Sequence, residues 1–189
     1  MWTCDTRWRH LVIGTYRSWD VGDERGFRSR GHRIHSAGDY QNLPPENEHK
    51  GLREYHRRNA APRVEIPEAL RAKLLAGFVR KLVDLDCEVI AASVSKKHAH
   101  FLVLMPDDYQ KERWIAGKAK QISSYLVRDE MPGRIWAAGG RFKLIKDRRH
   151  QLNVFKYIWK RQERDARTWC MFVPLPDEGK KNPGFPPQA

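Results

Sequence analysis

Two histidines near the middle of the chain have residue types and spacing that suit metal binding. His98 and His100 begin a strongly apolar run, HAHFLVLM, which is typical of a central β-strand. Side chains two residues apart in a strand point to the same face, so the two imidazoles would be neighbours there. Such a pair can hold a metal ion. The alternative is a pair of polar side chains near a strand end that are solvated or hydrogen-bonded to the backbone.

A tyrosine in a basic helical segment is the second residue that could do chemistry. Tyr157 lies in HQLNVFKYIWKRQERDAR, and on a helical wheel it falls opposite an apolar stripe and near Arg161 and Arg164. The stripe consists of Leu152, Phe155, Ile158 and Trp159. A phenol oxygen among cations could attack a phosphate group. An exposed tyrosine without a chemical role, on a solvated basic helix face, would leave the same pattern.

Strand-like and helical segments alternate along the chain and must position these residues. Strands are predicted at 8–16, 87–95, 98–105, 141–146 and 168–173, and helices at 67–86, 110–130 and 150–165. The short link Lys96-Lys97 makes a hairpin of the two middle strands. This order indicates an α+β sandwich, in which helices cover a mostly antiparallel central sheet, as in ferredoxin-like folds.

The length of the chain suits a single domain, which we place at residues 1–174. Residues 17–65 carry many arginines and histidines without sustained periodicity, so we predict a long basic insertion there. Residues 175–189 are rich in proline, glycine and lysine, and we expect them to form a disordered tail.

The charge of the chain indicates a polyanionic partner. Lysine and arginine number 36 against 23 aspartates and glutamates, which gives a formal net charge of +13 over 189 residues. Cations that neutralise phosphates release condensed counterions, so nucleic acid is the expected partner. No apolar run has the length of a membrane helix, and the N-terminus lacks the apolar core of a secretory signal. We therefore expect no membrane partner and a cytoplasmic location.

The motifs together resemble a known family. The segment SKKHAHFLVLMP resembles the His-hydrophobic-His (HUH) strand of the single-tyrosine transposases, and NVFKYIWKRQ resembles their nucleophile helix. The segments YRSWDVGDERG at 16–26 and IWAAGGRFKLI at 135–145 are similar to the branch of REP-associated tyrosine transposases. The resemblance covers most of residues 8–173. It implies an HUH endonuclease and transposase fold of the ferredoxin-like class, associated with the nucleoid, that nicks and rejoins single-stranded DNA next to hairpins.

The resemblance also assigns roles to residues. Tyr157 would be the nucleophile that forms a 5′-phosphotyrosyl DNA intermediate, and His98 and His100 would hold Mg²⁺ or Mn²⁺. Gln162 matches the glutamine that supplies a further metal ligand in many relatives. In some relatives that glutamine follows the tyrosine by four residues, whereas Gln162 follows by five, about 140° around an ideal helix. Glu163 is an inferior alternative ligand on the same geometry.

Basic residues around these motifs would contact the DNA. Lys97 stands where the family motif usually has asparagine, which alters the phosphate contacts expected near the metal. The predicted DNA-binding residues are Lys97, Arg161, Arg164, Arg28, Arg30 and Arg33, of which the last three would clamp a hairpin. The resemblance leaves open whether the protein acts as a homodimer or as a monomer.

Two other functional classes fit the same composition. A non-catalytic or domesticated nucleic-acid-binding module would use the positive charge but would need neither the histidine pair nor Tyr157. A metal-dependent nuclease that activates water would cleave DNA without Tyr157.

Overall fold

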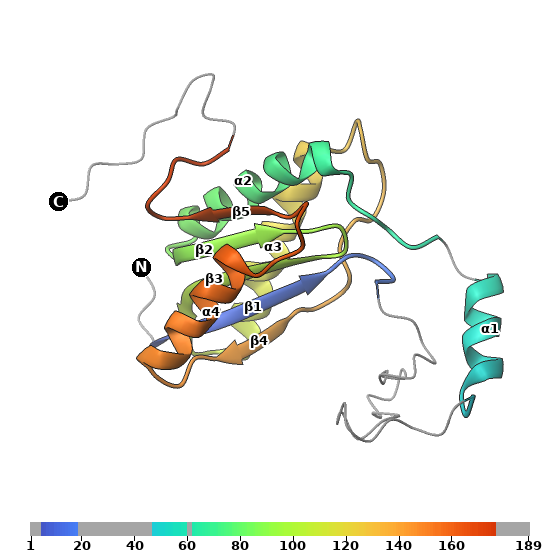
Figure 1. The fold of residues 1–189 in the computed structure, drawn as a ribbon, viewed down its shortest axis with the longest axis horizontal. Coiled ribbons are helices and arrows are strands. Elements are labelled where there is room, and N and C mark those ends of the chain that lie inside the picture. Colours follow the sequence, from blue (N-terminus) through green and yellow to red (C-terminus); the bar gives the residue numbers. More distant parts are fainter. Residues whose placement is uncertain (1–4, 19–46, 60–61, 177–189) are drawn as a thin grey trace.

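The computed structural model describes residues 5–18, 47–59 and 62–176, which form an α+β fold with a five-stranded antiparallel sheet and four helices (Figure 1). In chain order the elements are β1 (Thr6–Gly14), α1 (Lys50–Asn59), α2 (Glu68–Asp84), β2 (Glu88–Val94), β3 (His98–Pro106), α3 (Tyr109–Leu126), β4 (Arg141–Leu144), α4 (Arg148–Lys160) and β5 (Arg167–Cys170). The predicted α+β class is thus confirmed.

The strand that begins with the two histidines lies in the centre of the sheet. The strand order is β4-β1-β3-β2-β5, so β3 has a partner on each side. It pairs with β1 from Thr6↔Pro106 to Gly14↔His98, and with β2 through the hairpin at Lys96-Lys97. The apolar run of β3 explains this place, because a central strand that is covered on both faces buries nearly all of its side chains.

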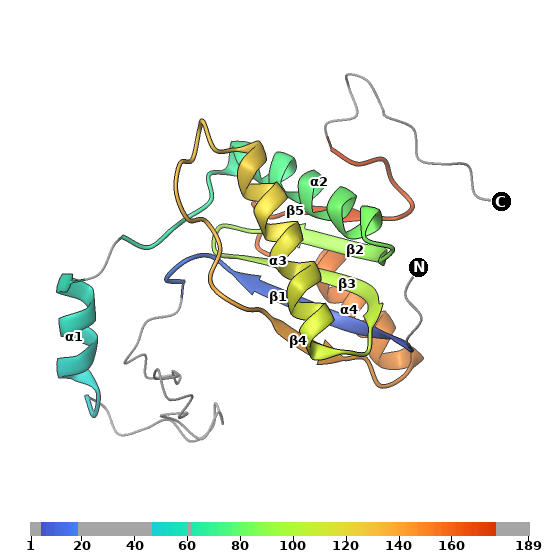
Figure 2. The ribbon, with the colours of Figure 1, turned by 180° about the vertical axis from the view of Figure 1, so that it is seen from behind.

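Helices cover both faces of the sheet. Helices α2 and α3 lie on one face and α4 lies on the other, as the opposite views of Figures 1 and 2 show. Side chains alternate along a strand, so Ala99 and Phe101 of β3 face α2 and α3, whereas His98, His100 and Leu102 face α4. The larger core, between the sheet and α2 and α3, includes Phe78, Phe101, Leu11, Leu74 and Trp136. The smaller core under α4 consists of Ala91, Leu102, Val154, Ile158 and Cys170.

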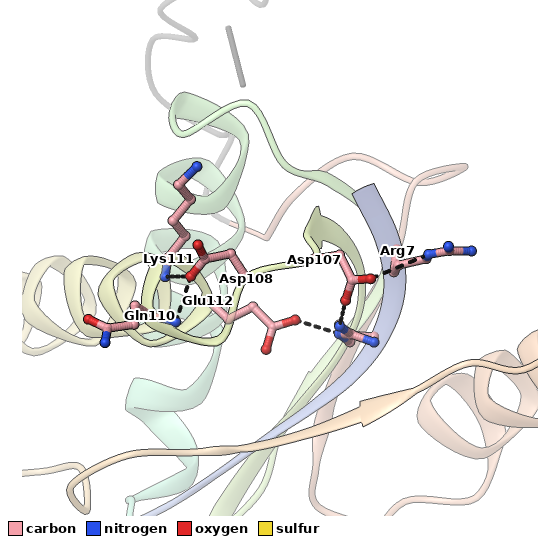
Figure 3. A network of polar contacts seen from close by, with 7 residues as sticks. Arg7, Asp107, Asp108, Gln110, Lys111 and Glu112 are labelled. Atoms are coloured by element: carbon pink, nitrogen blue, oxygen red, sulfur yellow. Dashed lines mark hydrogen bonds and ion pairs between the residues drawn. The ribbon is translucent and has the colours of Figure 1, made fainter. Parts of the chain in front are cut away.

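A buried ion pair ties β1 to the start of α3. Arg9 is 8% exposed, and its Nε donates to Oε1 of the buried Glu112 at 2.5 Å. Its Nη2 also donates to Asp107, which in turn contacts the exposed Arg7 at 3.5 Å (Figure 3). Burial raises the pKa of Glu112 above its ordinary value even though Arg9 opposes that shift. The pair therefore joins the two elements at the expense of desolvating two charges.

Three features of the described residues differ from the sequence-based expectations. The predicted insertion contains a regular helix, α1, which the sequence did not indicate because its ten residues hold too few apolar positions to show a period. Helix α4 ends at Lys160, whereas the sequence predicted an end at about residue 165. At the observed end, the backbone N–H of Arg161 donates to the carbonyl of Tyr157. Leu175, the first residue of the predicted tail, is 4% exposed and belongs to the larger core.

The start of α4 is held by an aspartate cap. Oδ1 of Asp147 accepts a hydrogen bond from the backbone N–H of His150 at 2.7 Å, which satisfies a donor that has no partner within the helix. We expect Asp147→Ala to lower the free energy of unfolding by about 1 kcal/mol in urea denaturation. Asp147→Asn should retain nearly all of the stability, because its amide oxygen can accept the same bond. Equal losses in both variants would contradict a capping role.

Candidate active site

Three histidines from two neighbouring strands meet on the α4 face of the sheet. The ring centroids of His98 and His100 are 4.8 Å apart, as expected for side chains on one face of β3. The third imidazole comes from β1, where His10 lies diagonally across from His100, because the register pairs Val12 with His100. Nε2 of His10 lies 3.0 Å from Nδ1 of His100, so the two rings are hydrogen-bonded.

Tyr157 of α4 lies against two of these rings, those of His100 and His10. Its ring centroid lies 5.4 Å from that of His100 and 6.0 Å from that of His10, both in edge-to-face geometry. The side chain of Tyr157 is still 39% exposed, so a ligand can reach it from solvent. Residues far apart in the sequence are therefore brought together, and the predicted nucleophile stands beside His100, one of the two predicted metal ligands.

The buried side of α4 matches the predicted stripe in part: Ile158 is buried, and Phe155 and Trp159 pack against the smaller core. The residues that α4 buries are Gln151, Val154 and Ile158, whereas Leu152 is 42% exposed. The buried stripe is thus turned toward Gln151 and Val154, because α4 covers the narrow strip of β2 and β3 that carries Ala91 and Leu102. Tyr157 lies next to this stripe and not opposite it, and this places its ring over the histidines.

The hydrogen bonds of His98 determine which of its nitrogens is free. Oγ of Ser95 lies 2.5 Å from Nδ1 of His98 and also donates to the backbone carbonyl of His98 at 3.1 Å. A serine hydroxyl has one proton, so Oγ accepts from Nδ1–H once it donates to the carbonyl. In the tautomer that this hydrogen bond favours, the lone pair of the His98 ring lies on Nε2.

Burial keeps two of the three imidazoles uncharged. Burial, with smaller contributions from His98 and His10, lowers the pKa of His100 to about 3. The pKa of His10 is lowered to about 4, first by burial and then by the charges of Lys143, His150 and Arg141. Both rings are therefore neutral at pH 7 and each has one nitrogen lone pair, which is the form that binds metal ions.

Two polar atoms at the centre of the site lack partners. Nε2 of His100 and Oγ of Ser93 are buried and have no hydrogen-bond partner within the described part of the chain. Ser93 of β2 is the cross-strand partner of His100, so its side chain lies on the same face. An unpartnered nitrogen on a neutral imidazole suits a ligand that accepts its lone pair.

Two ring nitrogens of the site suit the predicted divalent ion as ligands. Nε2 of His98 and Nε2 of His100 could hold the ion, while Ser95 and His10 occupy the Nδ1 atoms, as outer partners of metal-bound histidines do. In residues 5–18, 47–59 and 62–176, no group of three or more histidine, cysteine, aspartate or glutamate side chains is arranged to hold a metal ion. The pair would therefore leave open positions for phosphate oxygens or water.

The predicted further ligand lies just beyond the end of α4. The side-chain amide of Gln162 donates to the carbonyl of Tyr157 at 3.1 Å, so it helps to cap the helix. Glu163, the alternative, is exposed in the turn that follows. A role of Gln162 at the metal stays a prediction.

Three of the predicted DNA-binding residues lie in the described part of the chain: Lys97, Arg161 and Arg164. Lys97 lies in the hairpin immediately before His98 and forms an ion pair with Glu65 at 3.5 Å. Arg161 and Arg164 are exposed after the end of α4, and Arg164 lines a pocket at the start of α2. Arg28, Arg30 and Arg33 lie outside the described residues.

His10 is the residue of the site that sequence reasoning missed. It belongs to the predicted strand WRHLVIGTY, where a single histidine between Arg9 and Leu11 gives no sign of a partner. The signal that could have found it is the face it shares with Trp8 and Val12 in the strand period. Its contact with His100 depends on the antiparallel register between two strands, which brings together residues 90 positions apart in the chain.

We expect the metal-free protein to lose stability in acid through His10. In the unfolded chain His10 takes up a proton near the ordinary pKa of 6.5, whereas in the folded chain its pKa is about 4. The unfolded state therefore holds more protons between these values, and the free energy of unfolding falls as the pH drops through this window. The contribution of His10 is about 2 kcal/mol between roughly pH 7 and pH 4.5. Urea denaturation at both pH values should show a smaller decline in His10→Phe, and an unchanged decline would contradict this.

Comparisons with models of protein families, with curated proteins and with solved structures found no match for the chain. In the part of the chain that the structure describes, no helix combines the length and apolar character needed to cross a membrane. The functional interpretation therefore depends on the chemistry of Tyr157 and the three histidines.

Proposed function

We propose that the protein is an HUH single-tyrosine endonuclease and strand transferase that acts on single-stranded DNA next to hairpins. The observation that carries the proposal is the position of Tyr157, whose ring stands edge-on to His100 at 5.4 Å although the two residues come from different layers of the fold. A nucleophile and a metal pair must share one phosphate, so they must lie this close.

The fold supports the proposal through its element order. With α1 left aside, the order β1-α2-β2-β3-α3-β4 follows the β-α-β-β-α-β pattern of ferredoxin-like folds, and α2 and α3 lie on one face of the sheet. Helix α4 and β5 follow this unit, and α4 carries Tyr157 on the face of the sheet opposite to α2 and α3. We therefore include in this proposal the HUH-type fold that the family resemblance implies.

In the proposed reaction Oη of Tyr157 attacks the scissile phosphorus. The bond from phosphorus to the 3′ oxygen breaks, the 3′ oxygen takes up a proton, and the phenol proton leaves to solvent through the exposed side of Tyr157. The new ester between Tyr157 and the 5′ phosphate keeps the phosphodiester energy, so a second 3′-hydroxyl can reverse the step without ATP. A divalent ion held by His98 and His100, Mg²⁺ or Mn²⁺, would neutralise charge on the phosphate.

Basic side chains would hold the DNA backbone during both steps. Lys97 adjoins the metal pair in sequence, and Arg161 follows the nucleophile helix directly, so both are near enough in the chain to meet the flanking phosphates. Phosphate contacts of this kind position the strand without reading its sequence. The loss of either contact should make DNA binding less dependent on salt, because each contact releases counterions.

The test is incubation of the protein with hairpin-bearing single-stranded DNA and Mn²⁺, followed by a denaturing gel. The proposal predicts a protein–DNA band that survives denaturation, forms only with the metal and disappears with a chelator. Cleaved DNA without a covalent band would favour a nuclease that activates water. Binding that is indifferent to chelator, with no cleavage, would favour the non-catalytic binding module.

A further inference from the structure

We propose that His10 is a positioning residue: it accepts the Nδ1 proton of His100 and so directs the Nε2 lone pair of His100 toward the metal ion. The inference rests on the proposed metal site, which it deepens by adding a residue from β1. His10 would touch neither the ion nor the DNA, and it would act only through His100.

The first step is the contact between the two rings. Nε2 of His10 and Nδ1 of His100 are 3.0 Å apart, which is a hydrogen-bond distance between two ring nitrogens. Such a bond contains one proton, because two N–H groups would repel each other and two lone pairs would form no bond. One of the rings therefore donates and the other accepts.

The second step decides which ring donates. If His10 donated, the other nitrogen of His100, Nε2, would carry a buried N–H that has no acceptor among the described residues. An unsatisfied buried donor is unfavourable, and a protonated Nε2 could not bind a metal ion. If His100 donates, its Nε2 has a lone pair instead, and a bound ion satisfies it.

The neighbouring histidine has the same arrangement through a different partner. Nδ1 of His98 is hydrogen-bonded to Oγ of Ser95. The lone pair of the His98 ring is therefore on Nε2, as in His100. The two neighbouring imidazoles thus each have a hydrogen-bonded Nδ1 and a lone pair on Nε2, so both present the same nitrogen as a metal ligand. Ser95 and His10 thus have the same role toward the two histidines of the strand.

The direct test is the tautomer of His100 in the metal-free wild-type protein. Long-range ¹H–¹⁵N NMR spectra at neutral pH distinguish a protonated ring nitrogen from an unprotonated one. The proposal predicts a proton on Nδ1 and none on Nε2 of His100. A proton on Nε2 would overturn it, whatever the activity of the protein.

Variants extend the test to metal affinity. His10→Phe removes the acceptor, whereas His10→Gln keeps an oxygen near the position of Nε2. We expect His10→Phe to weaken Mn²⁺ binding about 10–100-fold in calorimetry, since outer partners of metal ligands have effects of this size. His10→Gln should recover most of the affinity, and His56→Phe on α1 is the matched control that should bind as wild type does. Equal affinities in His10→Phe and wild type would overturn the proposal.

These measurements separate the inference from the proposed function. If the wild-type protein has the predicted tautomer and binds Mn²⁺ but never cleaves DNA, the proposed transferase function is rejected and the role of His10 is retained. If the wild-type protein forms the covalent band and His10→Phe keeps the wild-type Mn²⁺ affinity, the role of His10 is rejected and the transferase function is retained. Thermal denaturation of His10→Gln shows whether the fold has survived the substitution.

Discussion

We expect Tyr157→Phe to abolish the covalent protein–DNA product that the proposed function predicts for the wild-type protein with Mn²⁺. The substitution removes only the hydroxyl, and the phenylalanine ring can keep the edge-to-face contact with His100. Loss of a nucleophile costs on the order of 10³-fold or more in rate, which places the product below detection on a gel. Mn²⁺ affinity should stay as in wild type, because the phenol is not among the proposed ligands.

The control for this prediction is another exposed tyrosine. Tyr125 on α3 is 57% exposed, and α3 lies on the face of the sheet opposite to α4. Tyr125→Phe should form the covalent product at the wild-type rate. Cleavage at an undiminished rate in Tyr157→Phe would reject a tyrosine nucleophile and support attack by water.

Arg9→Met will lower the free energy of unfolding by about 3–5 kcal/mol, because it leaves the buried carboxylate of Glu112 without its partner. Glu112 is 3% exposed and accepts from Nε of Arg9 at 2.5 Å. Burial already raises the pKa of Glu112 in the intact pair, so removal of Arg9 will raise it further. Urea denaturation at neutral pH measures the loss.

Two further variants make this prediction specific. Arg9→Met/Glu112→Leu should recover most of the lost stability, because it replaces both charges by apolar groups of similar size. Arg7→Met is the matched control: the exposed pair of Arg7 with Asp107 at 3.5 Å should cost under about 1 kcal/mol. A loss in Arg9→Met no larger than that in Arg7→Met would show that the buried pair does not hold β1 to α3.

The parts of the fold that the sequence predicted are those with a local signal. The apolar run after His98 indicated a central strand, and Lys96-Lys97 left room only for a hairpin, both as observed. The repeated leucines of 67–86 indicated α2, which spans Glu68–Asp84. Local periods and short links are written in consecutive residues, so they can be recognised without knowledge of the tertiary fold.

The parts that the sequence could not predict depend on contacts between distant elements. The pairing of His10 with His100 requires the register of β1 against β3. The orientation of α4 follows from the small patch around Leu102 that it covers, which rotates the buried stripe away from Leu152. The basic surroundings of Tyr157 and the family resemblance predict a nucleophile. Its position beside the imidazole of His100 follows only from the packing of α4 on the sheet.

The most direct test of the central claim is mass spectrometry of the protein after reaction with hairpin-bearing single-stranded DNA and Mn²⁺. The covalent product is digested with protease and nuclease, and the modified peptide is sequenced. The proposed mechanism predicts a nucleotide joined through its 5′ phosphate to Tyr157, together with a free 3′-hydroxyl on the released DNA. Cleaved DNA with no modified peptide, or a modification on any other residue, would contradict it.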